Sequence, residues 1–584
     1  MVGGNNKKTI GLVIENIFTD FAEEFIQNVA SGIRQRKDLN LVVIAGKYDG
    51  NKDKTDHYHW NRLIYNSVYC LEELGNFDGL IICLGSMANI QKEDVQRRYF
   101  TEITKVPKVF AVTESEENVS VNYENESGIR EAVECLVNVH GITRFGMLGG
   151  REDNVDSRKR QALFEKCLTD NGIEFKDENY EMTDMSVNCR KEAAALLDRI
   201  PDIQAIFCVN DAVAVGLFEE MHARHMEPGR EIKVFGFDNT KMAGRMIPTL
   251  ASIGADETTL GRKSLELLLA MMNGEKVSSV RIPTRLYGRE SFAYEMYDYT
   301  KQEMLNVDSA FIYRMFDDCF YRYRYEYIDR ESVNLKRLFW EFMNRLLTAV
   351  KNRYMSREEF RETSELIDIF FENGAMDYTD AGKLLHSIDR VQGAINTSQT
   401  MVSASANMYI NRLFTRMRDA AIKAQSDALI LQKESVVATR QNLLDFMIEN
   451  TDYTGDCEDK IENIISHFDL LGMKNAALFL FDEPVIFEED NMYIFPSHIR
   501  MKCGVKEGEL YVLPYERQRC LLSEMFKRIE LLPNCYECVV FPITFRKKIY
   551  GFMVTEFTQD TSSMGEFVAE QIGRLLAEAM ESEK

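Results

Sequence analysis

Short apolar runs alternate with amphipathic segments along the first half of the chain. The runs predict strands at residues 8–14, 41–45, 79–84 and 106–112, and the periodicity of residues 21–36 predicts an amphipathic helix. Strands that alternate with helices are typical of a parallel sheet covered by helices on both faces. We therefore expect a doubly wound α/β lobe in this part of the chain.

A second strand, helix and strand unit lies in residues 204–239. Apolar runs at residues 205–209 and 232–237 each end in polar residues, Asn210-Asp211 and Asp238-Asn239. Residues just past the carboxyl ends of parallel strands line the ligand crevice of an open sheet. An amide and carboxylates there indicate a hydrogen-bonding site rather than a nucleophile. Crossing strands near residues 112–121, 249–253 and 281–286 would join two such lobes around a cleft.

Several motifs in this half resemble the effector-binding part of the lactose-repressor (LacI/GalR) family, which shares its fold with periplasmic sugar-binding proteins. The ND at residues 210–211, followed by a helix and by GFD at residues 236–238, carries most of the likeness. Residues 122–150, Ser157 with Arg158 and Arg160 where the family has S..R..G, and residues 250–253 before Leu260-Gly261 agree with it. The resemblance implies a two-lobed, doubly wound periplasmic-binding-protein-like domain over residues 7–295.

The resemblance also implies a set of ligand-binding residues. Arg158 would offer a guanidinium fork to ligand oxygens, Asn210 would donate and accept, and Asp238 would accept from hydroxyls. In the loop after the first strand, aromatic faces beside planar polar groups suit the two sides of a sugar ring. The expected ligand-binding residues are Asn16, Phe18, Phe21, Arg158, Asn210 and Asp238.

Structural alternatives stay open for several of these residues. Arg158 could pair with a local carboxylate such as Asp153 or Asp156, and Asp238 could cap the following turn or helix. Phe18 and Phe21 could be ordinary core. The chain also departs from the family, with Leu163 where a glycine is usual and Phe18-Thr19-Asp20-Phe21 in place of an NPF-like segment. The identity of the ligand is therefore not carried over.

The composition becomes aromatic and charged after residue 294. Residues 308–351 predict helix, and residues 356–397 predict two shorter helices, which together suggest a helical domain over residues 300–398. Basic and aromatic residues interleave at residues 321–330, a pattern that fits either nucleic acid or a packed helix with solvated arginines. The acidic surroundings favour the packed helix.

Residues 399–450 contain no proline or glycine and predict one long helix. Apolar or small residues alternate by four and three, at Ile410, Phe414, Met417, Ala421, Ala424, Ala428 and Leu431. Such a heptad seam predicts a parallel dimeric coiled coil, which would act as a signalling helix between domains. The alternative is a helix packed within one chain.

The pattern returns to mixed α/β over residues 454–584. It predicts a helix at residues 459–468, strands at 476–481, 493–495 and 510–513, a hairpin of residues 538–544 and 549–556, and a last helix at 564–582. This layout resembles a GAF domain, a module that binds small molecules or dimerises. Cys535 and Cys538 have CxxC spacing, with Cys503 and Cys520 upstream, so a metal or redox site and buried core cysteines are both open.

The net charge and the absence of several motifs argue against some classes of function. The formal net charge of −23 argues against a protein whose main task is to grip phosphates. No run reaches the ~18 apolar residues of a membrane helix, and the polar start leaves no room for a signal peptide, so we expect a cytoplasmic protein. The twelve cysteines form no disulfide framework. No P-loop, GxSxG, HExxH or cyclase signature is present, so we expect no enzyme and no cofactor.

Our leading hypothesis is a cytoplasmic ligand-sensing regulator that lacks the family's helix-turn-helix head. A small polar metabolite, expected to be a sugar, would close the cleft, and a coiled-coil homodimer would relay closure to an unknown downstream partner, with no role for a membrane. One alternative is the sensory portion of a signalling enzyme of the diguanylate-cyclase type without its catalytic domain. Another is a LacI-like transcription regulator that acts through a different DNA-binding element.

Overall fold

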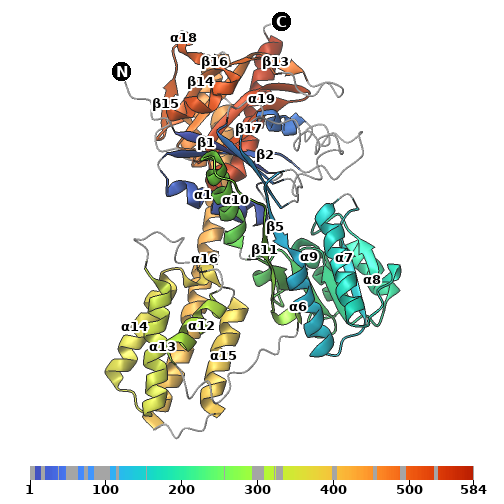
Figure 1. Cartoon of the computed structure of the whole chain (residues 1–584). Coiled ribbons are helices and arrows are strands. Elements are labelled where there is room, and N and C mark those ends of the chain that lie inside the picture. Colours follow the sequence, from blue (N-terminus) through green and yellow to red (C-terminus); the bar gives the residue numbers. More distant parts are fainter. Residues whose placement is uncertain are drawn as a thin grey trace.

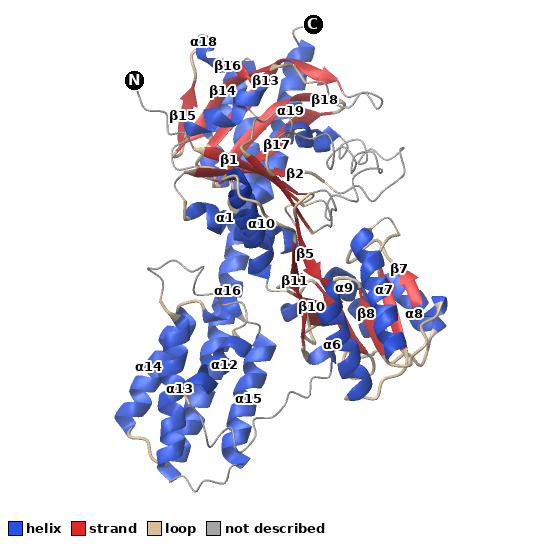
Figure 2. Cartoon of the chain, in the orientation of Figure 1, coloured by secondary structure: helices blue, strands red, loops and turns tan. Residues whose placement is uncertain are grey.

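The structure is a computed structural model, and it describes residues 7–14, 17, 20–36, 38–47, 64–71, 77–83, 106–112, 118–152, 154–255, 257–292, 308–320, 323, 333–379, 381–397, 404–451, 457–486, 495–531 and 537–582. Two α/β lobes, a helical bundle and a carboxyl-terminal α/β part make up the chain (Figures 1 and 2). One long helix runs from the bundle to the carboxyl-terminal part.

The first lobe is a parallel sheet, as its alternating pattern predicts. Its strands are β1 (Lys8–Ile14), β2 (Leu39–Ala45), β3 (Gly79–Ile82), β4 (Lys108–Ala111), β5 (Ser120–Glu124) and β11 (Val280–Pro283), in the order β11-β5-β4-β3-β1-β2. Helices α1 (Asp20–Arg34) and α10 (Glu257–Met272) pack against each other beside this sheet. The apolar side chains of α1 face the core and are buried.

The second lobe is a six-stranded sheet in the order β12-β10-β9-β8-β6-β7. Its strands are β6 (Phe145–Gly149), β7 (Tyr180–Met182), β8 (Ala205–Cys208), β9 (Lys233–Phe237), β10 (Ala251–Gly254) and β12 (Arg285–Tyr287). The accompanying helices are α6 (Asn125–Asn138), α7 (Val155–Asp170), α8 (Arg190–Arg199) and α9 (Asp211–Ala223). The chain passes between the lobes after β5, β10 and β11, close to the three predicted crossings.

The carboxyl-terminal part is an antiparallel sheet with helices. It contains β13 (Ala476–Ile486), β14 (His498–Lys506), β15 (Glu509–Val512), β16 (Arg519–Leu521), β17 (Glu537–Phe545) and β18 (Lys548–Glu556), with α17 (Cys457–Ser466) and α19 (Gln559–Ser582). The predicted hairpin is confirmed as β17 and β18. Strand β14 was not predicted, and residues 493–494 lie outside the described residues.

The sheets of the first lobe and of the carboxyl-terminal part are continuous. Strand β17 pairs in parallel with β2, from Glu537 opposite Leu41 to Val540 opposite Ile44, which gives one twelve-stranded sheet. Both carboxylate oxygens of Glu537 accept hydrogen bonds from Arg34, at 2.6 and 2.7 Å. The hydrophobic cores on both sides of this sheet include side chains from both parts. Two segments that the sequence indicated as separate domains therefore form one body.

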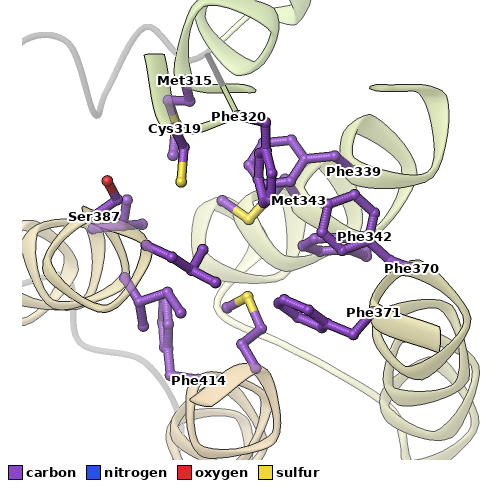
Figure 3. A pocket seen from close by; sticks show the side chains of 14 residues that line it. Met315, Cys319, Phe320, Phe339, Phe342, Met343, Phe370, Phe371, Ser387 and Phe414 are labelled. Atoms are coloured by element: carbon purple, nitrogen blue, oxygen red, sulfur yellow. The ribbon is translucent and has the colours of Figure 1, made fainter. Parts of the chain in front are cut away.

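The helical region is a bundle of α12 (Ser309–Cys319), α13 (Leu335–Asn352), α14 (Arg357–Glu372), α15 (Ala381–Thr397) and the first part of α16 (Ala404–Thr451). The aromatic spacing of the sequence is explained by burial between these helices. A cavity of about 30 Å³ lies among them, and Figure 3 shows phenylalanine rings and sulfur atoms around it, including Phe342, Met343 and Cys319. Of residues 321–330, only Tyr323 is described, and it is buried in the bundle.

The predicted dimer seam needs a correction in its first part. Ile410, Phe414, Met417 and Ala421 are buried inside the bundle of their own chain, so they are not available to a partner helix. Periodic apolar residues on one helix face fit both a dimeric coiled coil and packing within one chain. In this part of the helix they pack within the chain. Beyond Ala424, which still packs against the bundle core, the helix leaves the bundle, and Leu431 is 66% exposed.

Three of the four cysteines that could have formed a metal or redox site are described, and they do not converge. Cys503 belongs to the core on one face of the sheet, whereas Cys520 and Cys538 belong to the core on the other face. Cys535 lies outside the described residues. Among the residues that the structure describes, no cluster of three or more His, Cys, Asp or Glu side chains could hold a metal ion. No helix in that part of the chain is long and apolar enough to cross a membrane.

Candidate functional site

A small cavity lies between the two lobes. The first lobe lines it with side chains of α1, β5 and α10, and the second lobe lines it with residues that follow β9; together they are Phe21, Glu24, Phe25, Tyr123, Leu260, Asp238 and Thr240. Its volume of about 10 Å³ suffices for about one water molecule. A sugar-sized ligand therefore requires the lobes to separate before it enters.

Arg160 and Asp238 form the charged centre of this cleft. Arg160 Nη2 donates to Asp238 Oδ1 at 3.2 Å, and Nη1 donates to the carbonyl oxygen of Val209 at 2.7 Å. The guanidinium carbon lies 3.6 Å from the ring centroid of Phe237, which fits a cation–π contact. The side chain of Arg160 is 6% exposed, and that of Asp238 is 22% exposed. Asp238 thus keeps part of its carboxylate accessible while the arginine holds its orientation.

A buried network fixes the backbone that carries Asp238. Asp238 and Asn239 have φ angles of 97° and 50°, a conformation that side chains other than glycine rarely adopt. Asn239 accepts a hydrogen bond from Arg289 at 2.7 Å, and its own N–H donates to Ser252 Oγ at 2.9 Å. These contacts explain why the strained turn persists, since strained residues persist only where their surroundings determine them.

Asp211 also stabilises the turn that carries Asp238 and Asn239. Its carboxylate accepts hydrogen bonds from the N–H and hydroxyl of Thr240, at 2.7 and 3.0 Å, and from Ser252 Oγ at 2.5 Å. A Cβ at position 236 would lie 2.3 Å from Asp211 Oδ1, so the close approach requires Gly236. Burial, with a smaller contribution from the charge of Asp238, raises the pKa of Asp211 to about 7. This carboxyl group therefore titrates near neutral pH.

Aromatic side chains provide the apolar walls of the cleft. Tyr123 is buried, and its ring centroid lies 6.0 Å from that of Phe237 in an edge-to-face arrangement. Burial raises the pKa of the Tyr123 hydroxyl well above its ordinary value, so the group stays protonated. Phe21 and Phe25 stack with centroids 5.9 Å apart at the opposite side, on α1. Carboxylate and guanidinium groups between aromatic walls can bind a ligand with polar edges and apolar faces.

Only some of the predicted ligand-binding residues lie in the cleft. Asp238 and Phe21 line the cleft. Asn210 caps α9, accepting from the N–H of Val213 at 2.9 Å and donating to the Met185 carbonyl at 3.1 Å. Arg158 is exposed, and its side chain makes no hydrogen bond or ion pair with the described residues. Asn16 and Phe18 lie outside the described residues.

Sequence reasoning did not select Arg160, although the motif contained it. On α7, the buried positions include Ser157, Arg160, Phe164 and Cys167, which recur at spacings of three and four, and Leu168 beside them. An arginine on the apolar stripe of a helix must find a partner inside, whereas Arg158 lies off this stripe. The same reasoning had no means to select Tyr123, Glu24 or Thr240, because their roles depend on how the lobes meet.

Residues 136–292 match a family model described as a periplasmic binding protein-like domain. The catabolite control protein A of Priestia megaterium is 25% identical over 288 residues, which is 48% of this chain and 81% of that protein. The HTH-type transcriptional regulator CelR of Thermobifida fusca is 28% identical over 180 residues, 30% of this chain and 53% of that regulator. The match therefore spans about half of CelR.

A solved structure of a transcriptional regulator CelR–cellobiose complex is 22% identical, covers 49% of this chain and 86% of that chain, and has a TM-score of 0.41. Residues 136–292 of the chain are thus similar to periplasmic binding protein-like domains. CelR and the PurR protein of Vibrio vulnificus, which also matches, are described as an HTH-type transcriptional regulator and an HTH-type transcriptional repressor.

Proposed function

We propose that this protein is a ligand-sensing regulator that binds a small polar metabolite of the sugar class between its two lobes. The main observation behind this proposal is the Arg160–Asp238 pair, which places a partly accessible carboxylate between aromatic side chains. The similarity to regulators, one of them solved with cellobiose, supports the choice of ligand class. A ligand without matching hydroxyls would leave these polar groups unpaired, which makes such a site selective.

Each residue of the cleft has a distinct proposed role. Asp238 accepts hydrogen bonds from ligand hydroxyls, and Arg160 takes the guanidinium role that the sequence had indicated for Arg158. Phe21 and Tyr123 cover the apolar faces of the ligand. Asn210 exchanges its bond to the Met185 carbonyl for one to the ligand. Ligand binding drives closure only if the closed arrangement binds more tightly than the open one.

The sheet that joins β2 to β17 determines which parts can move. The first lobe and the carboxyl-terminal part form one body, so closure moves the second lobe against both. Helix α16 connects the bundle to this body, since Phe446 near its end is buried there. The carboxyl-terminal part, with its GAF-like layout, is proposed to receive the change through α16.

The exposed part of α16 is the proposed dimer contact. Leu429, Ile430, Val436, Val437 and Leu444 recur with heptad spacing, and each is at least 45% exposed. A wide apolar stripe on an isolated helix is unfavourable in water and favours pairing. Glu434 and Arg440 lie three residues to either side of Val437, so two copies that cross antiparallel at Val437 would bring these opposite charges together. This proposal replaces the parallel arrangement first predicted and shifts the contact toward the carboxyl-terminal part of the helix.

A second candidate is transcription regulation through a DNA-binding element other than a helix-turn-helix head. It is favoured by the identity of the relatives, which are HTH-type regulators. A gel shift with genomic fragments at moderate salt tests it. The comparisons give no support to the sensory portion of a signalling enzyme.

Thermal unfolding of the full chain against neutral sugars, sugar phosphates and nucleosides tests the sensor function. A ligand at 100 times its dissociation constant adds about 2.7 kcal/mol to the free energy of unfolding. A hit among the sugars supports the proposal. The absence of any stabilising compound across all three classes contradicts it.

A further inference from the structure

A single loop of the second lobe touches both the cleft and the helical bundle. The loop covers residues 240–250 and begins at Thr240, which lines the cleft and is held by Asp211. Lys241, next in the chain, lies 3.9 Å from Glu24 of α1 across the cleft. One end of the loop therefore lies where the two lobes meet.

The other end of the loop packs against the bundle. Its short helix η3 (Ala243–Arg245) contacts α15. A Cβ at Gly382 of α15 would lie 3.1 Å from Thr249 Cγ2 and 3.3 Å from Thr249 Oγ1, so helix and loop are in close contact and a side chain here would push them apart. The positive charge of Lys241 also acts on Asp377 of the bundle, opposing the effect of burial on the pKa of that carboxyl group.

Internal hydrogen bonds make the loop one unit. The N–H of Ala243 donates to the Thr240 carbonyl at 3.1 Å, and the N–H of Leu250 donates to the Ala243 carbonyl at 2.8 Å. Glu290 accepts from both the N–H and the hydroxyl of Thr249, at 2.7 and 2.9 Å. Hydrogen bonds therefore connect Thr240 to Ala243 and Ala243 to Leu250, and Glu290 holds Thr249 beside them.

We propose that the loop of residues 240–250 is the contact through which the cleft controls the helical bundle, with Asp211 as its positioning residue. This rests on the proposed function, and it gives the relay a definite path: from Thr240 through the loop to α15, then through the bundle to α16. Helix α16 is attached to the body formed by the first lobe and the carboxyl-terminal part. When the second lobe moves against this body, the contact between the loop and Gly382 of the bundle changes.

Coupling between two sites is reciprocal, so a change on the bundle side must alter the cleft side. The test compares Gly382→Met with Gly393→Met in the full chain. Both glycines lie in α15, but a Cβ at Gly393 meets no atom within 4 Å, so Gly393→Met controls for the change in helix propensity. Hydrogen exchange is measured at Asp238, Asn239 and Thr240, whose amides donate within the cleft network.

We expect Gly382→Met to speed exchange at these three amides at least about threefold, and Gly393→Met to leave it unchanged. Equal exchange in the two variants overturns the proposal. If Gly382→Met disrupts the bundle, seen as lost protection in α13, the smaller pair Gly382→Ala and Gly393→Ala gives the same comparison. No ligand is needed, so a failed search for a sugar contradicts the proposed function without deciding this result. With cellobiose as the probe, altered affinity in Gly382→Met alone adds support.

Discussion

Arg160 and Asp238 lie 78 positions apart in the sequence and meet at 3.2 Å in the cleft. Arg160 comes from the buried stripe of α7, and Asp238 from a strained turn after β9. Both groups keep unused hydrogen-bonding capacity, because the Asp238 side chain is partly accessible and the buried Nε of Arg160 has no hydrogen-bond acceptor among the described residues. The pair thus holds a charged group in place for a polar ligand.

Stability should depend on pH through Asp211. Its pKa of about 7 in the folded chain exceeds the ordinary value of about 3.9 in an unfolded chain. The folded state thus retains a proton that the unfolded state has lost between about pH 4 and 7, so the free energy of unfolding falls as pH rises through this window. Asp238 and Arg289 are the charged side chains that act on it, the first raising and the second lowering its pKa.

The Asp211→Asn variant should lose this dependence. We expect the difference in unfolding free energy between pH 4.5 and 7.5 to shrink by on the order of 3 kcal/mol relative to the wild type. Urea unfolding followed by fluorescence at both pH values measures it. Asp177→Asn, at an exposed position, should keep the wild-type dependence. An equal pH dependence in Asp211→Asn and the wild type would show that Asp211 does not titrate in this range.

A fragment that ends at Phe292 should not be a stable sensor. It would leave the β2 edge unpaired and expose apolar side chains that both sheet faces share with β17 and β18. We expect the fragment to aggregate on expression, and co-expression with residues 457–582 to restore a soluble complex. A soluble, cooperatively unfolding fragment on its own would contradict the joined sheet.

The exposed stripe of α16 should make the chain dimeric. Lysines at Ile430 and Val437 place charges in the apolar contact, so the double variant Ile430→Lys with Val437→Lys should be monomeric by light scattering at micromolar concentration. The control, Ala428→Lys with Ala438→Lys, adds the same charge at exposed positions outside the stripe and should stay dimeric. A monomeric wild-type chain at tens of micromolar would exclude this contact.

Local patterns predicted the elements of the lobes well. Strand β1, helix α1 and the unit from β8 to β9 follow from apolar runs and polar strand ends, and the crossings follow from where those runs stop. The pairing of β2 with β17 left no such signal, since strand edges separated by hundreds of residues carry no shared periodicity. The alternation of four and three in α16 was equally uninformative about its partner, because a bundle and a dimer require the same apolar face.

The candidate site was predictable only in part. Asp238 was identifiable from its place after a buried strand, and its position in the cleft agrees with that expectation. The S..R..G motif does not distinguish Arg158 from Arg160, whereas the helical period places Arg160 with Ser157 and Phe164 on the buried face of α7. Asn210 has the expected place but uses both polar atoms within its own lobe.

Calorimetric titration of the stabilising sugar into the full chain tests the central claim most directly. The variants are Asp238→Ala, Arg160→Met and, as the matched control, Arg158→Met. Loss of a charged hydrogen-bonding partner should weaken binding by about 2 kcal/mol, or roughly thirtyfold, in the first two variants. Arg158→Met should bind as the wild type does. Wild-type affinity in both Asp238→Ala and Arg160→Met would contradict a ligand site between the lobes.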